Sequence, residues 1–289
     1  MPVTNETKRN FDGQNLTETP EEIFTLDNLI ELSLYNNRIK HIPEDVYRLS
    51  ELQVLNYAGN EIETLSPSIQ HLQNLRMLDL GHNRMRELPK EISALQKLDS
   101  FLYLSNNQFE RIPAELCQLR RLKYLNVTDN KLAELPANLG DLQSLVELRL
   151  YNNQIEALPE SISSIRCLRE IHVYGNRLTR LPETIGDVSD LRILDVSNNR
   201  IEELPQSIGG LKKLHRLNLR TNRLKELPEQ IGDVTNLIEL DLRDNDLKVI
   251  PDAILKLERL EKLDLRWNHH LQVTPCLFEL EKRGCLIYR

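Results

Sequence analysis

One arrangement of residues recurs along almost the whole chain, and it restricts the fold to a stack of similar units. An asparagine marks each copy at an interval of 23 residues, except for the interval of 24 residues between Asn83 and Asn107. The series is Asn37, Asn60, Asn83, Asn107, Asn130, Asn153, Asn176, Asn199, Asn222, Asn245 and Asn268. A fixed interval of this length is typical of solenoids, in which each unit buries its apolar side chains against its neighbours.

Residues 191–211 show the frame of one copy. The alternation of apolar and polar residues around Leu194 and Val196 predicts a short strand with one buried face. Asn199 follows where the chain must turn, and its amide can satisfy backbone donors and acceptors at the corner. Pro205 lacks an N–H and cannot continue strand pairing, and the spacing of the apolar residues after it predicts a single 3₁₀ or α turn.

Eleven copies in register resemble the leucine-rich repeat family over about residues 9–280. The 23-residue form with Leu-Pro-x-x-Ile is similar to intracellular repeats of Ras-pathway scaffold proteins, plant Ras-group proteins and bacterial relatives. The resemblance implies an α/β fold: a right-handed solenoid with a parallel sheet on the concave face and short turns on the convex side. It also implies protein binding on the concave face, without catalytic activity or a cofactor.

We interpret the chain as one domain, residues 1–289. Residues 1–28 form a degenerate repeat and N-terminal cap, in which Phe11, Leu16 and Pro20 match the frame. Residues 29–271 hold the eleven repeat frames, and residues 272–289 form a C-terminal cap.

Three places depart from the frame. The segment 98–104 has one extra residue before its asparagine, which predicts a bulge at the start of the strand. Pro67 comes one position late, which we expect to be harmless, and the last repeat has one extra residue after Asn268.

The end of the chain carries the signals of a capping unit. Thr274 and Pro275 predict an N-cap and the first position of a helix, which continues from Cys276 to Arg283. Gly284 predicts a left-handed stop, and residues 285–288 a final edge strand. The alternative is a zinc site made of His269, His270, Cys276 and Cys285. Their spacing matches no standard zinc pattern, and we expect no metal.

The composition favours some classes of protein over others. The formal net charge of -7 argues against nucleic-acid binding, which usually needs a basic face. The sequence has no run of about 18 apolar residues to span a membrane. Its first residues, Met1–Lys8, do not resemble a secretory signal. With four dispersed cysteines, we expect free thiols and a cytoplasmic location.

One column of strand positions on the face away from the core is unusually apolar. Successive repeats place Val54, Met77, Phe101 and Tyr124 there, although this face should contact water. Tyr103 joins them from the next column, and Tyr151 and Tyr174 extend the group from the column after that. Exposed apolar patches often mark contact surfaces, so we predict a partner-binding patch. The alternative is simple packing of neighbours along the sheet.

The other end of the same face is rich in arginine. Arg220, Arg243 and Arg266 occupy one column in consecutive repeats, beside Asp241 and Asp264. The residues Arg177, Arg200 and Arg223 form a second column. Trp267, the only tryptophan, follows Arg266. On such a surface the arginines and acids either pair with one another in a salt-bridge network, or the arginines form a site for an acidic or phosphorylated segment.

These observations leave several functions open. The first is a cytosolic scaffold that docks a signalling partner, such as a small GTPase, on its concave face. The second is an exported bacterial effector that acts on host proteins. A third is an enzyme using His172 with the arginines and acids around it, although no catalytic motif supports it. The fourth is nucleic-acid binding through the arginine columns.

Overall fold

The structure is a computed structural model that describes residues 7–289. The prediction that the first residues are no secretory signal falls mostly on residues 1–6, outside the described part. The chain divides into two compact units, and each is described by itself. Unit 1 comprises Met1–Leu132 and Asp141–Leu145, and unit 2 comprises Ala133–Gly140 and Val146–Arg289. The interpretation as one domain therefore stays a prediction.

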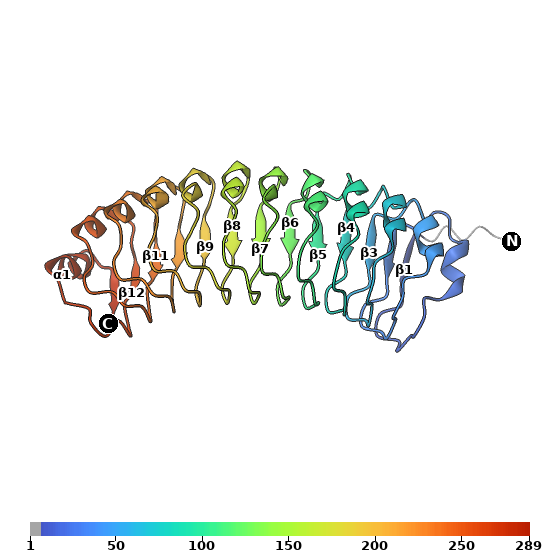
Figure 1. Ribbon diagram of the computed structural model, residues 1–289, viewed down its shortest axis with the longest axis horizontal. Helices are drawn as coiled ribbons and strands as arrows, with labels where there is room; N and C mark the ends of the chain where they lie inside the picture. Colours follow the sequence, from blue (N-terminus) through green and yellow to red (C-terminus); the bar gives the residue numbers. More distant parts are fainter. Residues whose placement is uncertain (1–6) are drawn as a thin grey trace. The chain divides into compact units, whose positions relative to one another are not determined.

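Unit 1 contains six short parallel strands that pair in sequence order (Figure 1). They are β1 (Lys8–Asn10), β2 (Glu31–Ser33), β3 (Val54–Asn56), β4 (Met77–Asp79), β5 (Phe101–Tyr103) and β6 (Tyr124–Asn126). Its 3₁₀ turns are η1 (Glu21–Thr25), η2 (Glu44–Arg48), η3 (Pro67–His71), η4 (Lys90–Ala94) and η5 (Ala114–Gln118). In the segment predicted as a degenerate first repeat, β1 pairs with β2 and η1 follows Pro20.

Unit 2 repeats the same plan. Its strands are β7 (Glu147–Arg149), β8 (Glu170–His172), β9 (Ile193–Asp195), β10 (Arg216–Asn218), β11 (Glu239–Asp241), β12 (Lys262–Asp264) and β13 (Leu286–Tyr288). Its turns are η7 (Glu160–Ser164), η8 (Ile185–Asp187), η9 (Gln206–Gly210), η10 (Glu229–Asp233) and η11 (Asp252–Lys256). Helix α1 (Pro275–Lys282) follows near the end of the chain. The turn η6 (Leu139–Asp141) has residues of both units. In the described part of the chain, no helix is long and apolar enough to cross a membrane.

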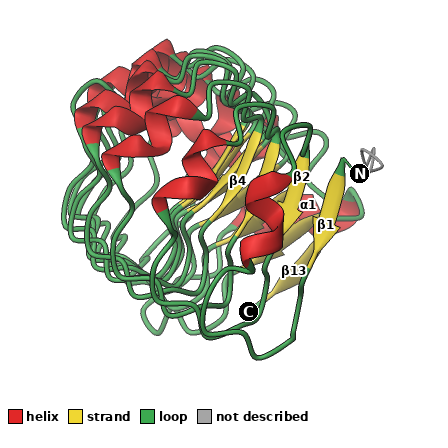
Figure 2. Ribbon diagram, turned by 90° about the vertical axis from the view of Figure 1, so that its right-hand side faces the viewer, coloured by secondary structure: helices red, strands yellow, loops and turns green. Residues whose placement is uncertain are grey.

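Each repeat has a strand on one side and a 3₁₀ turn on the other (Figure 2). The middle residue of a strand points into the core, as Leu55, Leu78 and Leu194 do with no exposed surface. The apolar residues of the turns, such as Ile92 and Ile208, meet them from the opposite side and are equally buried. The predicted plan of a repeat, with parallel strands on one side, short turns on the other and leucine-rich packing between them, is therefore confirmed within each unit.

The asparagine series forms the predicted corner of each repeat. The Asn83 amide donates to the carbonyl oxygens of Tyr57, Leu80 and Gly81 at 3.0, 3.0 and 3.1 Å. Its Oδ1 accepts from the backbone N–H of Ile62 at 2.9 Å. Each side chain thus joins its own turn to the preceding repeat. Ten of the eleven are buried, and Asn222 is half-buried.

The irregular repeats are absorbed locally. The extra residue of segment 98–104 lies before β5, between Leu98 and Phe101, and β5 pairs with both neighbours without a bulge inside the strand. The insertion places Asp99 where Arg76 donates two 3.0 Å hydrogen bonds to it. At the late proline, the Ser66 hydroxyl accepts from the Ser68 N–H at 3.2 Å and caps η3. The turn therefore forms in spite of the late proline.

The C-terminal cap is present with two corrections. The helix begins at Pro275 as predicted and ends at Lys282, one residue earlier than predicted, and Gly284 has the left-handed φ of +96°. Thr274 is extended as an N-cap residue should be, but its side chain caps no backbone N–H. Its hydroxyl lies 3.0 Å from the Cys276 sulfur instead. The predicted edge strand is confirmed as β13, which pairs with β12.

Candidate functional site

The face of the sheet turned away from the core carries the candidate binding residues, and we call it the open face. In unit 1 the rings of Phe101, Tyr103 and Tyr124 meet on β5 and β6. Their centroids are 5.1–5.7 Å apart, with Phe101 stacked on Tyr103 and edge-on to Tyr124. Phe101 is 41% exposed and both tyrosines are half-buried. We call these three residues the aromatic cluster.

Val54 and Met77 lie in the same column as Phe101 and are half-buried on β3 and β4. In unit 2, Tyr151 and Tyr174 stack with centroids 4.7 Å apart at an interplanar angle of 18°. The structure therefore brings the predicted aromatic residues together in two groups, one on each unit. A role for either group in partner binding stays a prediction.

Asp79 stands directly beside Tyr103 in the register of β4 and β5. Its Oδ1 accepts a hydrogen bond from the Gly81 N–H at 2.9 Å. Burial raises the pKa of the Asp79 carboxyl above its ordinary value, more than the hydrogen bond from Gly81 and the charge of His82 lower it. The preceding repeat uses Asn56 for the same backbone contact without a charge, and so does Asn126, two repeats further along the chain.

Replacing Asp79 by asparagine is therefore expected to stabilise the protein at pH 7, by about 0.5 kcal/mol. A carboxyl whose pKa is raised by folding favours the folded state when it is protonated and opposes it when it is ionised. The advantage of Asp79→Asn should therefore shrink as the pH falls through the raised pKa, and vanish below about pH 3.5. Urea unfolding of both proteins between pH 3 and 7 measures the difference, and a constant difference would contradict the assignment.

Unit 2 carries the arginine column. Arg243 pairs with Asp241 through a bidentate contact, and its Nε lies 3.4 Å from Oδ2 of Asp264. Arg266 donates to the same Asp264 at 2.6 and 3.0 Å. Burial alone would raise the pKa of Asp264, but the hydrogen bonds and charges of these arginines lower it overall. These two arginines thus form the salt network that is one of the two alternatives from the sequence.

Trp267 stands at the end of this column, 52% exposed. The guanidinium carbons of Arg220 and Arg266 lie 5.9 and 5.7 Å from its ring centroid, within the range of cation–π contacts. Its φ of +63° is left-handed, a conformation that is unfavourable for a bulky side chain. The corresponding position in most other repeats holds Asn, Asp or Gly.

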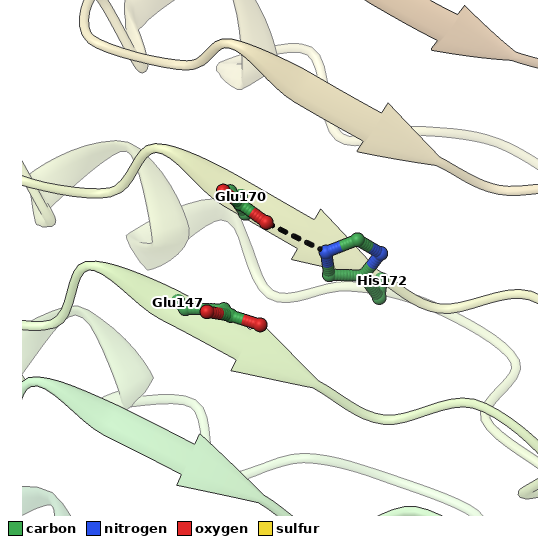
Figure 3. A group of neighbouring side chains, drawn as sticks. All are labelled: Glu147, Glu170 and His172. Atoms are coloured by element: carbon green, nitrogen blue, oxygen red, sulfur yellow. Dashed lines mark hydrogen bonds and ion pairs between the residues drawn. The ribbon is translucent and has the colours of Figure 1, made fainter.

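A third group lies on β7 and β8 of unit 2 (Figure 3). Glu147, Glu170 and His172 are half-buried, and one donor atom of each lies within 4.8 Å of the others. Oε2 of Glu170 is 3.1 Å from Nε2 of His172. The sequence pointed to His172 but not to its grouping with the two glutamates. The recurrence of the frame could have revealed it, because it predicts that Glu147 and Glu170 are direct neighbours on adjacent strands.

The alternative zinc site at the C-terminus fits the donor chemistry poorly. Cys276 and Cys285 are buried, and neither is in a disulfide. Burial raises the pKa of Cys285 to about 11, which keeps its thiol protonated at neutral pH. Since zinc binds the thiolate, this cysteine is a weak candidate ligand.

Comparison with solved structures places the fold in context. A leucine-rich repeat protein of Leptospira interrogans is 34% identical, with a TM-score of 0.90 over 99% of this chain and 72% of that chain. The ectodomain of the Arabidopsis thaliana receptor kinase GASSHO1/SCHENGEN3, in complex with CASPARIAN STRIP INTEGRITY FACTOR 2, is 26% identical, with a TM-score of 0.55 over 90% of this chain and 41% of that chain. The Drosophila Toll–Spatzle complex contains a chain 20% identical, with a TM-score of 0.80 over 98% of this chain and 44% of that chain, which shows the fold alone.

A comparison with curated proteins gave no match. The family described as leucine rich repeat matches residues 29–85, 50–109, 166–224 and 213–269, and the leucine-rich repeat region matches residues 106–186. These matches cover well over half of the sequence and agree with the asparagine frame. The chain therefore belongs to the leucine-rich repeat family.

Proposed function

We propose that the protein is a non-catalytic protein-binding module whose partner docks on the open face of unit 1, centred on the aromatic cluster. The observation that carries this proposal is the contact of Phe101, Tyr103 and Tyr124 on a face that would otherwise be wet. Tyrosine and other aromatic residues are enriched where interfaces gain most of their binding free energy. Since the rings already support one another, binding orders few further side chains.

The class of partner is supported by relatives of the same fold. Both the receptor kinase ectodomain and Toll are seen in complexes with other proteins. The resemblance to Ras-pathway repeats favours a folded signalling protein, with a small GTPase as the first candidate. A cytoplasmic location is part of the proposal and rests on the four dispersed cysteines of the sequence.

The test is a pair of substitutions in the aromatic cluster. Phe101→Glu together with Tyr124→Glu places two charges where the partner would bury apolar surface. A partner captured by the intact chain and then purified should bind this variant at least about 30-fold more weakly. Isothermal titration calorimetry measures the two affinities, with circular dichroism to establish that the variant is folded.

Tyr35→Glu is the matched control. Tyr35 is 48% exposed on the same unit but lies outside the aromatic cluster. The control should bind the partner within about threefold of the unchanged protein. Equal binding by the folded double variant would overturn the proposed surface, and a small GTPase that fails to bind the unchanged chain would overturn the choice of partner.

A further inference from the structure

The cross-strand register of unit 2 creates an unusual pair of acids. Glu147 on β7 stands directly opposite Glu170 on β8. Like charges that face each other on adjacent strands destabilise a sheet unless a cation lies between or beside them. The adjacent acids Asp241 and Asp264 are bridged by Arg243, with Arg266 as a second cation.

Among the described residues, fewer cations are paired with Glu147 and Glu170 than with Asp241 and Asp264. Arg149 donates from Nε to Oε1 of Glu147, while Glu170 is joined to the imidazole of His172. In the part of the chain that the structure describes, Arg149 is thus the one guanidinium that is paired with these two carboxylates, and the imidazole nitrogen of His172 lies beside Glu170. Two carboxylates and an imidazole nitrogen gathered in this way are the kind of donor set that binds a metal ion.

The donor atoms suit a transition-metal ion. Zinc binds carboxylate oxygen and imidazole nitrogen at about 2.0–2.2 Å, so tetrahedral ligand atoms lie roughly 3.3 Å apart. The 3.1 Å between Glu170 Oε2 and His172 Nε2 already matches this separation. Glu147 extends from the adjacent strand, and its ligand atom lies within 4.8 Å of those of Glu170 and His172 (Figure 3).

Arg149 does not exclude a metal. It bonds one oxygen of Glu147, and a carboxylate can bind an ion through the other. Metal-ligating carboxylates are commonly hydrogen-bonded in this way by neighbouring side chains. His172 also lines a hollow of about 260 Å³ with Asp195 and Arg216, which leaves solvent or another donor access to its vicinity.

We propose that Glu147, Glu170 and His172 form a site for one divalent transition-metal ion, with Zn²⁺ as the expected occupant. Imidazole nitrogen favours Zn²⁺, Ni²⁺ or Cu²⁺ over Mg²⁺ and Ca²⁺, which prefer oxygen ligands alone. Three protein ligands leave a coordination position for water or for a donor from another molecule. The proposal is independent of the aromatic cluster, which lies on unit 1.

The test uses the full chain without a polyhistidine tag, freed of metal by a chelator and titrated with Zn²⁺ alone in a calorimeter. We expect saturable binding of one ion per chain. His172→Ala and Glu170→Gln should each weaken binding at least about tenfold. One equivalent of Zn²⁺ should also raise the Tm of the unchanged protein and not that of the His172→Ala variant.

Two controls keep this outcome specific. His82→Ala and Glu202→Gln remove one exposed residue of each type elsewhere and should leave the affinity within about threefold. Replacing His269 and His270 together by alanine tests the C-terminal alternative. The proposal is overturned if Zn²⁺ shows no saturable binding up to about 1 mM, if the folded His172→Ala variant binds as tightly as the unchanged chain, or if binding depends on His269 and His270 instead.

Discussion

Replacing Asn83 by alanine is expected to lower the free energy of unfolding by about 3 kcal/mol. The side chain is buried and serves two repeats at once. Without it, the carbonyl oxygens of Tyr57 and Leu80 and the N–H of Ile62 lose their hydrogen bonds to the amide. Buried backbone groups without partners are costly, and alanine can neither donate nor accept at this corner. Urea unfolding followed by circular dichroism measures the loss.

A control and a local readout distinguish this cause from general damage. Asn74→Ala removes an asparagine with exposed hydrogen bonds to Ser50 and Lys97, and should cost less than about 1 kcal/mol. Hydrogen exchange should show faster exchange of the Ile62 N–H in the Asn83 variant. If Asn83→Ala lowered the free energy of unfolding no more than Asn74→Ala does, the stability of the corner would come from packing alone.

Replacing Gly186 by alanine should destabilise unit 2 by about 3 kcal/mol. A Cβ on this residue of η8 would lie 1.9 Å from the carbonyl oxygen of Ser207 in the next repeat. That atom belongs to the backbone and cannot rotate away as a side chain could. The following turn would have to move, which would disturb the packing of both repeats. Thermal unfolding monitored by calorimetry should show a Tm lowered by several degrees.

Gly81→Ala is the matched control for this prediction. Its Cβ would meet the Ser105 hydroxyl at 3.1 Å, and the equivalent position of the preceding repeat already holds Ala58. We expect a change within about 1 kcal/mol. An unchanged Tm for Gly186→Ala would show that the turns of η8 and η9 can separate without cost.

The sequence predicts most of the fold because its signals are local and recur. The alternation around Leu194 specifies a strand, Asn199 marks the corner and Pro205 begins the return path. Gly284 marks the end of the helix in the same way, since few residues other than glycine adopt its φ readily. The sequence also predicts that Thr274 caps the helix, but its hydroxyl contacts the Cys276 sulfur instead. The sequence does not show this competing contact.

The candidate sites also have features that the sequence predicts and features that it does not. The columns of the repeat place Phe101 next to Tyr124 and Arg243 next to Arg266, and the structure has both neighbours in register. The repeat frame does not predict the rotamers of the side chains. Asp264 accepts hydrogen bonds from Arg266 and also faces Arg243 because of the rotamers that these side chains adopt. The contact between Glu170 and the imidazole of His172 likewise depends on their rotamers.

The sequence by itself determined the repeat, its core, its asparagine corners and its family, because each depends on the periodic placement of residue types along the chain. The tertiary structure decided what lies between repeats: the approach of Gly186 to Ser207, the shared pairing of Asp264, and the meeting of Glu147 with Glu170 and His172. The physical reason is that stacking distance and side-chain rotamers are set by contacts between residues about 23 positions apart, which no single repeat contains.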